Sequence, residues 1–331
     1  MKKLLFIGLL LLAACGQRQS IGTDKVVVAY VTSWTSDMPD PQYMTHINYA
    51  FGHVDSTFSA VRIDNPERLR SIAALKKQSP SLNVMLSVGG WGSGNFSEMA
   101  ASEEFRKSFC ASCAEAVEEF GLDGIDIDWE YPTSSAAGIS ASPDDTENFT
   151  LLMRDLREAL GEGKFLTIAT SATAKYIDYK AIVGYLDFVN VMAYDMSMGD
   201  SHHSGLYPSA YSADLTSSEA VKAHLDAGVP REKLVMGMPF YGRGSRRFGR
   251  YVNFSEVSAQ GYTPCWDEVS QVPFIVDSLR NYVFGYEDTR SLAIKCQYIV
   301  DEGLHGGMYW DYSGDNPEHD LARTVRDGLL R

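Results

Sequence analysis

Apolar runs of strand length alternate with amphipathic stretches along most of this chain. The apolar runs occupy 25–33, 46–51, 83–88, 122–130, 165–170, 188–195, 234–241 and 306–311. Stretches with helical periodicity lie at 103–120, 144–160, 217–227 and 289–302. Eight strands with helical crossovers are typical of a closed parallel barrel. The pattern therefore predicts an α/β fold, a (β/α)₈ TIM barrel, in one domain over 25–331 with no internal repeat or low-complexity linker.

One of these predicted strands has an acidic face. In the segment 123–132, DGIDIDWEYP, the odd positions hold Ile125, Ile127 and Trp129, and the even positions hold Asp126, Asp128 and Glu130. Successive side chains of a strand point to opposite faces, so the three carboxylates share one face, about 6 to 7 Å apart. An exposed edge strand would also present such a face, but Asp and Glu are poor strand formers.

Buried carboxylates in a row repel one another and lose hydration, so at least one should hold a proton near neutral pH. Such perturbed acids are typical of functional sites. A magnesium or calcium site would need further oxygen ligands in a surrounding loop, whereas hydrophobic residues separate these acids. The seven histidines show no metal-ligand spacing, and Cys110 and Cys113 lie on a predicted helix as core residues, so we expect neither a metal nor a cofactor.

The barrel gives this face a location, because side chains at the C-terminal ends of barrel strands line the active site. Asp126 should lie deepest, Asp128 above it, and Glu130 at the mouth. The other strand ends are rich in aromatic and polar side chains: Tyr30 and Trp34, Asn48 to Phe51, Ser87 to Trp91, Met192 to Asp195, Met236 to Arg243, and Gly306 to Asp311. Aromatic faces stack on sugar rings, and polar groups bind sugar hydroxyls.

The spacing of these acids also resembles a known sequence motif. Asp123, Asp126, Asp128 and Glu130 form DxxDxDxE, which resembles the signature of family 18 glycoside hydrolases, the chitinases and their relatives. The segment from Ser87 to Gly90 is similar to the SxGG motif of that family. The resemblance extends from Val26 to the end of the chain.

The resemblance implies a substrate-assisted, retaining reaction, for which family 18 is a known exception among glycosidases. Glu130 would be the general acid and then the general base. Asp128 would bind the acetamido N–H of the substrate, and Asp126 would share a proton with Asp128. Tyr194 would hold the acetamido oxygen, and Asp195 would contact the sugar at the mouth.

The resemblance also implies substrate-binding positions. Trp310 would form the floor beneath the cleaved sugar, Trp91 the platform on the leaving-group side, and Trp34 a contact further toward the non-reducing end. The remaining expected positions around the acids and the sugar are Tyr30, Phe51, Gly90, Met192, Met238, Tyr241 and Arg243.

Chitin or its oligomers are the expected substrate. An endo-β-N-acetylglucosaminidase acting on N-glycans would use the same acids, so this alternative stays open. A non-catalytic chitin-binding lectin on the same barrel would typically lack the acid at Glu130. Many family members insert an α+β module between the seventh and eighth strands. The segment 244–305 must also supply a barrel helix, so we expect at most a small insertion and a shallower cleft.

The N-terminus predicts export. Two lysines and an apolar run precede Leu12-Ala13-Ala14-Cys15, which resembles a bacterial lipobox. We expect a signal peptide over 1–14, lipidation of Cys15, a tether over 15–24, and a monomer at the cell envelope that meets the membrane only through this lipid. Removing two lysines changes the net charge from −14 to −16. This acidic balance argues against nucleic acid as a partner. A disulfide between Cys265 and Cys296 is left open.

Overall fold

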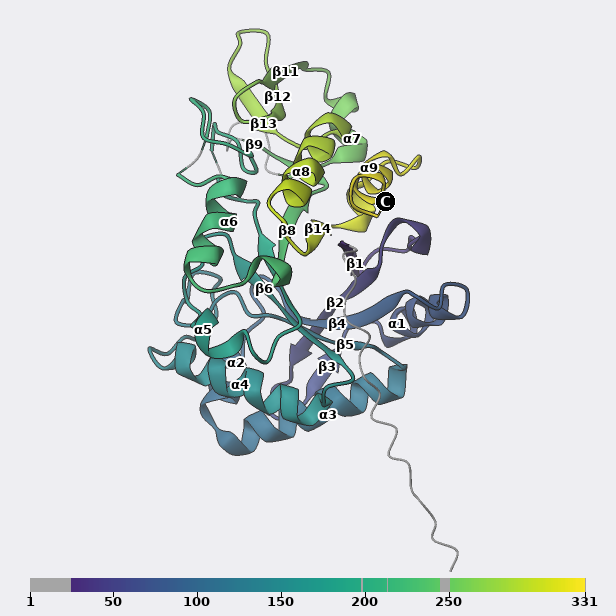
Figure 1. Cartoon of the computed structure of the whole chain (residues 1–331), viewed down its shortest axis with the longest axis vertical. Helices are drawn as coiled ribbons and strands as arrows, with labels where there is room; N and C mark the ends of the chain where they lie inside the picture. Colours follow the sequence, from purple (N-terminus) through teal and green to yellow (C-terminus); the bar gives the residue numbers. More distant parts are fainter. Residues whose placement is uncertain (1–24, 198, 213, 245–250, 331) are drawn as a thin grey trace, which may run out of the picture.

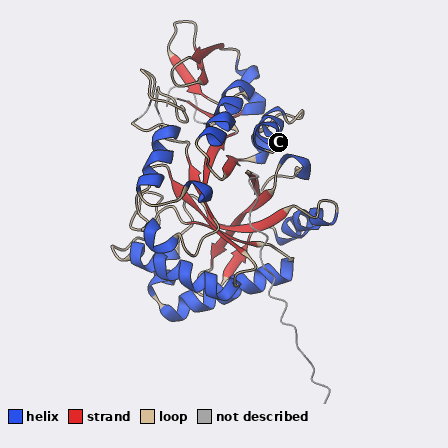
Figure 2. Ribbon diagram, viewed as in Figure 1, coloured by secondary structure: helices blue, strands red, loops and turns tan. Residues whose placement is uncertain are grey.

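Eight parallel strands close into a barrel within the part of the chain that the structure describes, residues 25–197, 199–212, 214–244 and 251–330 of a computed structural model (Figures 1 and 2). In barrel order they are β1 (Val26–Thr32), β2 (His46–Val54), β4 (Asn83–Gly89), β5 (Gly124–Asp128), β6 (Phe165–Ser171), β7 (Phe188–Met192), β8 (Leu234–Pro239) and β14 (Gly306–Trp310). Strand β1 pairs with both β14 and β2, which closes the barrel. The (β/α)₈ prediction is confirmed. The expected signal peptide, Cys15 and tether lie outside the described residues.

Three strands, β5, β7 and β8, end earlier than the sequence pattern indicated. Strand β5 ends at Asp128, so Glu130 lies just beyond it, and β7 ends at Met192, ahead of Asp195. The prediction at 234–241 was also too long, because β8 ends at Pro239 and Tyr241 begins a different strand. The side chains that the sequence placed at strand ends therefore belong partly to the loops that follow.

The four predicted helices are present as α3 (Glu103–Phe120), α4 (Asp145–Leu160), α6 (Ser217–Asp226) and α8 (Thr289–Asp301). Their ends follow local chemistry: Ser102 caps the first turn of α3, and Gly121 ends that helix with a φ of 63°. Asp288 and Ser291 form a capping box on α8. The sequence analysis did not predict α1 (Pro66–Ala73), α2 (Phe96–Ala101), α5 (Tyr179–Ile182) or α9 (Asp320–Leu329). Between β1 and β2 the described chain has only the short 3₁₀ turn η1 (Pro41–Tyr43).

A small antiparallel sheet follows β8 and lies at the top of Figure 1. Its strands are β9 (Tyr241–Gly244), β10 (Val252–Asn253), β11 (Thr263–Asp267), β12 (Val272–Val276) and β13 (Tyr282–Gly285), with the short helix α7 (Phe254–Val257). Strand β3 (Val61–Ile63) separately extends β2 in the antiparallel direction. The inserted sheet is consistent with the small insertion expected there. It begins directly after the C-terminal end of β8, so it lies at the end of the barrel where the acids are.

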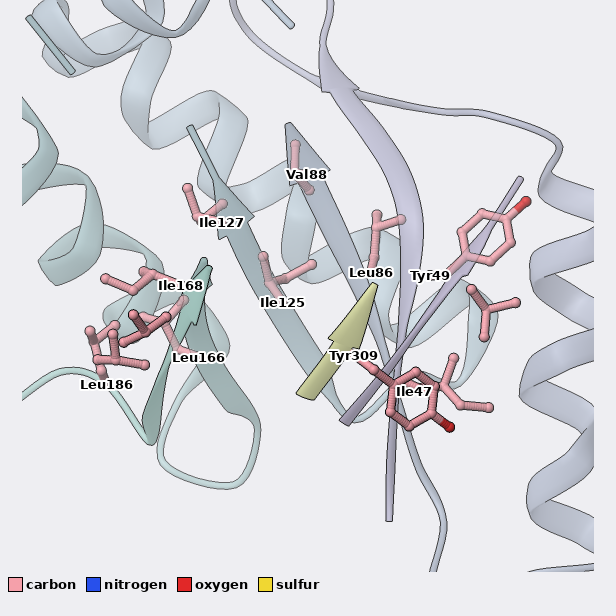
Figure 3. Packing of buried hydrophobic residues seen from close by; sticks show 14 of the residues in the cluster. Ile47, Tyr49, Leu86, Val88, Ile125, Ile127, Leu166, Ile168, Leu186 and Tyr309 are labelled. Carbon is pink, nitrogen blue, oxygen red and sulfur yellow. The ribbon is translucent and has the colours of Figure 1, made fainter. Parts of the chain in front are cut away.

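The hydrophobic core has two layers. Side chains such as Ile125, Ile127 and Leu166 point outward from the strands to pack beneath the helices (Figure 3). A smaller cluster, which includes Tyr30 and Met308, fills the barrel interior. Strand β5 thus buries its apolar face toward the helices and turns Asp126 and Asp128 into the barrel. None of the described helices is long and apolar enough to span a membrane.

Candidate active site

Asp126 lies at the bottom of the acid face, where its carboxylate accepts four hydrogen bonds. Oδ2 accepts from the Tyr30 hydroxyl at 2.9 Å and from Ser87 Oγ at 2.8 Å. Oδ1 accepts from Thr167 Oγ1 at 2.6 Å and from Asn190 Nδ2 at 3.2 Å. Burial raises the pKa of Asp126 above its ordinary value, and these four donors offset only part of this rise. With both oxygens accepting, the arrangement is that of an ionised carboxylate.

Asp128 lies above Asp126 in a different environment. Its side chain is buried, and Oδ1 has no hydrogen-bond partner among the described residues. Burial, followed by the negative charges of Glu130 and Asp126, raises the pKa of Asp128 well above its ordinary value. Burial and both neighbouring charges therefore favour the protonated form of Asp128.

Glu130 is the uppermost of the three acids and is partly exposed. Burial raises its pKa to about 7; the nearby charge of Asp195 adds to this rise, and a hydrogen bond with Tyr131 opposes it. Exposure thus increases from Asp126 through Asp128 to Glu130, in the order that the sequence analysis predicted. This gradient leaves Glu130 as the acid that can exchange a proton with a molecule at the mouth.

Aromatic side chains gather beside the acids on the β1, β2 and β14 side. The Trp310 ring stacks on Phe51 with centroids 5.6 Å apart and lies 5.6 Å from Tyr30 and 6.4 Å from Trp34. Gly90 makes this possible, because a Cβ at that position would lie 2.6 Å from Phe51 Cε2. Phe51, Trp310, Tyr30, Trp34 and Gly90 therefore lie together, as predicted.

Trp91 lies on another side of the acids, with 64% of its surface exposed and its ring 6.5 Å from Tyr131. A cavity of about 810 Å³ opens beside it, lined by the loop 91–95 and by residues at the end of β2. His53 fixes this loop, because its Nδ1 lies 2.8 Å from Ser93 Oγ and its Nε2 lies 2.9 Å from Asp64 Oδ2. Trp91 thus adjoins a space lined by both polar and apolar residues.

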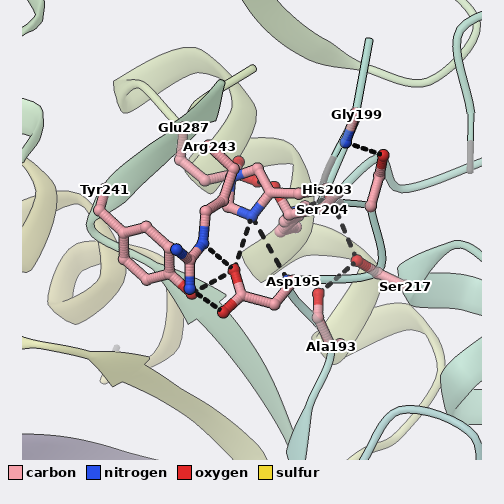
Figure 4. A network of polar contacts seen from close by, with 11 residues as sticks. Ala193, Asp195, Gly199, His203, Ser204, Ser217, Tyr241, Arg243 and Glu287 are labelled. Atoms are coloured by element: carbon pink, nitrogen blue, oxygen red, sulfur yellow. Dashed lines mark hydrogen bonds and ion pairs between the residues drawn. The ribbon is translucent and has the colours of Figure 1, made fainter. Parts of the chain in front are cut away.

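Asp195 is the centre of a third group of side chains (Figure 4). Arg243 donates to both of its carboxylate oxygens, at 2.7 and 2.6 Å, and the Tyr241 hydroxyl donates to Oδ1 at 2.8 Å. Burial raises the pKa of Asp195, but the hydrogen bonds and charges of Arg243 and His203 outweigh burial and hold the pKa well below its ordinary value. Asp195 is therefore ionised at neutral pH.

Tyr194 and Met192 lie between Asp195 and the barrel floor. Tyr194 is buried, and its hydroxyl contacts Met308 Sδ at 3.8 Å. Burial raises the pKa of Tyr194 well above its ordinary value, so its hydroxyl stays protonated and can donate a hydrogen bond. Met192 packs against the same interior cluster and is partly exposed.

Met238 was wrongly expected to bind substrate. Its side chain is fully buried in the layer between strands and helices, near Ile299 and Leu329 of α8 and α9. The alternation of β8 explains the error, because Val235 and Gly237 face the barrel interior and Met238 faces outward. In its place Gly237 leaves room for the Tyr194 ring.

Several site residues were missed by sequence reasoning. Thr167 and Asn190 bind Asp126, and each is a polar residue at an inward position of an otherwise apolar strand, which could have indicated this role. Ser87, which the sequence analysis named only as part of a motif, also binds Asp126. His203 and Glu287, described below, gave no such indication because they come from loops. No disulfide joins Cys265 to Cys296. The described residues include no group of three His, Cys, Asp or Glu side chains arranged to hold a metal ion.

Comparison with known proteins agrees with this geometry. Residues 26–315 match the model of the glycosyl hydrolases family 18. The chain is 32% identical to chitinase A1 of Niallia circulans over 78% of its own length and 44% of that protein. It is also 32% identical to probable chitinase 2 of Drosophila melanogaster, over 88% of its own length and 72% of that protein.

A solved structure also resembles this chain in sequence and fold. A family 18 N-acetylglucosaminidase from Paenibacillus barengoltzii is 35% identical and superposes with a TM-score of 0.83, covering 92% of this chain and all of that one. The family match spans the barrel strands and the acid face alike. The chain therefore belongs to family 18 of the glycosyl hydrolases.

Proposed function

We propose that this chain hydrolyses β-1,4-linked N-acetylglucosamine polymers and oligomers, chitin foremost, with the acetamido group of the substrate as the nucleophile. The observation that carries this proposal is the graded acid face, in which Asp126 accepts four hydrogen bonds, the pKa of Asp128 lies well above its ordinary value and Glu130 has a pKa of about 7. A glycosidase needs an acid that still holds its proton near neutral pH. The chitinases among the relatives support the choice of substrate.

In this reaction Glu130 donates its proton to the glycosidic oxygen while the acetamido carbonyl oxygen attacks the anomeric carbon. The leaving sugar departs, and a cyclic oxazolinium ion remains. Glu130 then takes a proton from water, which opens the ring with retention of configuration. Asp128 accepts the acetamido N–H through its unpartnered oxygen and shares its proton with Asp126, which leaves negative charge beneath the cation.

The aromatic groups supply the sugar subsites. Trp310 forms the floor under the cleaved sugar, and Tyr194 donates to the acetamido oxygen. Trp91 and the adjoining cavity receive the leaving sugars, and exposed Trp34 receives sugars toward the non-reducing end. Asp195 and Arg243 contact the sugar at the mouth.

Release of single N-acetylglucosamine residues is a second candidate, favoured by the 35% identity to a protein described as an N-acetylglucosaminidase. Trimming of N-glycans is a third, which uses the same acids. Product analysis on chitin oligomers of defined length beside a high-mannose glycopeptide distinguishes them. Disaccharides or longer products indicate a chitinase, monosaccharides alone indicate the second candidate, and cleavage of only the glycopeptide indicates the third.

Replacement of the general acid is the direct test. Glu130→Gln keeps the side-chain shape but cannot donate a proton, so hydrolysis of a chitin oligomer should fall by about 10²- to 10⁴-fold while oligomer binding persists. Glu104→Gln, an exposed glutamate on α3, is the matched control and should keep normal turnover. Substantial turnover by purified Glu130→Gln would remove Glu130 from this role.

We also propose that residues 1–14 direct export and that Cys15 is lipidated, which would hold the barrel at the cell envelope as a monomer. The support is the order of basic residues, apolar run and small residues before Cys15.

A further inference from the structure

Behind Asp195 lies a polar cluster at the two points where the inserted sheet leaves and rejoins the barrel. Tyr241 and Arg243 lie on β9, at the start of the insertion, and both bind the Asp195 carboxylate. Glu287 lies just after β13, at the end of the insertion. Its Oε1 accepts from Lys295 Nζ of α8 at 2.5 Å, and both side chains have 0% exposure.

His203 is buried between Asp195 and Glu287 (Figure 4). Its Nδ1 lies 3.4 Å from the backbone N of Asp195, and the next residue, Ser204, donates to Glu287 Oε1 at 2.6 Å. Figure 4 shows His203, Ser204 and Glu287 in the same network of polar contacts. Nδ1 of the His203 ring faces Asp195, and the neighbouring Ser204 connects this segment to Glu287.

Two atoms of this cluster are buried without a hydrogen-bond partner among the described residues: Nε2 of His203 and Oε2 of Glu287. Leaving a buried polar atom unpaired costs about 1–3 kcal/mol, and such atoms are rare in folded proteins. Here the two atoms are complementary, because an imidazole N–H is a donor and a carboxylate oxygen is an acceptor. The two side chains do not form an ion pair with each other, so one buried water between them would satisfy both atoms.

The contacts with Asp195 favour a proton on the Nε2 side of the ring. The backbone N–H of Asp195 points at Nδ1, which can accept it only if Nδ1 carries no proton. Nδ1 also lies 3.4 Å from Asp195 Oδ1, but that oxygen already accepts from Tyr241 and Arg243 at shorter distances. The proton of a neutral ring then lies on Nε2, on the side of Glu287.

The backbone of Asp195 has a conformation that needs support. Its φ is 55°, which lies in the left-handed region and is uncommon for a residue other than glycine. The His203 ring supports this backbone by accepting its N–H.

We propose that His203 is a positioning residue for Asp195: its Nδ1 holds the Asp195 backbone, and its Nε2–H is held toward Glu287 Oε2 through one buried water. The consequence for catalysis rests on the function proposed above. Glu287, anchored by Lys295, thereby links the end of the inserted sheet to the residue that contacts the sugar at the mouth.

A double-mutant cycle tests the catalytic part. His203→Asn keeps a group near Nδ1 but cannot reach Glu287, and we expect kcat/KM on a chitin oligomer to fall about tenfold. In an Asp195→Asn background the same change should have almost no further effect, because His203 acts through Asp195. His224→Asn, which removes a buried imidazole on α6, is the control and should leave kcat/KM unchanged. Equal tenfold losses in both backgrounds, or no loss in either, would overturn the positioning role.

A spectroscopic measurement tests the hydrogen bond without relying on activity. In protein labelled with ¹⁵N-histidine, the signals lost in His203→Asn identify the His203 ring. We expect the Nε2 shift of a protonated nitrogen, and an unprotonated Nε2 would overturn the link to Glu287. If the wild-type chain cuts no chitin oligomer, the proposed function fails, while this spectrum still decides the His203–Glu287 link.

Discussion

Neighbouring carboxylates on one strand acquire different properties from the donors around them. Asp126 receives four hydrogen bonds, Asp128 has a buried oxygen with no partner among the described residues, and Glu130 reaches the mouth. The residue type is nearly constant, so the difference in pKa comes from burial, hydrogen bonding and neighbouring charges. Each acid therefore has a role that its neighbour cannot take over.

The pKa of Glu130 predicts the alkaline limit of activity. As a general acid Glu130 must be protonated, so kcat/KM should fall as the pH rises through about 7. Asp195→Asn removes a nearby negative charge, which makes ionised Glu130 easier to form and should move this limit to lower pH. A pH profile of each enzyme on a fluorogenic chitin oligomer measures both. If the alkaline pH limit of kcat/KM stayed unchanged or rose in Asp195→Asn, ionisation of Glu130 would not be the cause of this limit.

A modified substrate can show which group acts as the nucleophile. A chitosan-like oligomer that lacks the acetyl group on the cleavage-site sugar should bind but not be cut there, because no acetamido oxygen is present to attack. Direct attack by Asp128 would tolerate the free amine. Analysis of acetylation at the new reducing ends distinguishes the two, and frequent cleavage after glucosamine would favour an ordinary two-carboxylate mechanism.

At the scale of elements, β4 and β5 approach each other closely where the acids lie. Gly89 pairs with Asp128 and has a φ of 133°, and a Cβ there would lie 1.9 Å from the Asp128 carbonyl oxygen. Gly89→Ala should therefore push β5 away, lower the free energy of unfolding by roughly 3–5 kcal/mol and abolish hydrolysis.

Chemical denaturation and an oligomer assay measure the two effects. Gly163→Ala is the control, because an added Cβ would meet no atom within 4 Å there, and its stability should change by less than about 1 kcal/mol. Wild-type stability in Gly89→Ala would show that the two strands can separate at no cost.

The same elements show what the sequence could predict. Strands of the barrel are buried on both faces, so their apolar runs predicted where they lie. The acidic residues that alternate along β5 predicted the position of the site. The ends of β5 and β7 were misplaced because polar strand ends and loop residues have the same composition. Met238 was misassigned because a resemblance to a motif does not fix which way one side chain faces. His203 and Glu287 meet only through the inserted sheet, whose short strands carry little periodicity.

At the scale of the whole molecule, the barrel contains the complete acid face and should not need its N-terminal segment for catalysis. Cys15→Ser should therefore leave the protein active but soluble without detergent, because only the lipid would hold it at the membrane. Fractionation of cells followed by an oligomer assay measures both properties. A variant that still requires detergent for extraction would contradict the lipidation of Cys15.

The tryptophans differ in exposure, so intrinsic tryptophan fluorescence can report on substrate binding. Trp34 and Trp91 are each 64% exposed at the rim, whereas Trp129 is 1% exposed beneath the helices. An indole in water emits at longer wavelength than one covered by an apolar surface. A sugar chain that covers both rim rings would shift emission to the blue, while Trp129 would supply a constant background. The emission wavelength would then report occupancy of the cleft without an added label, even in a variant that cannot hydrolyse the sugar chain.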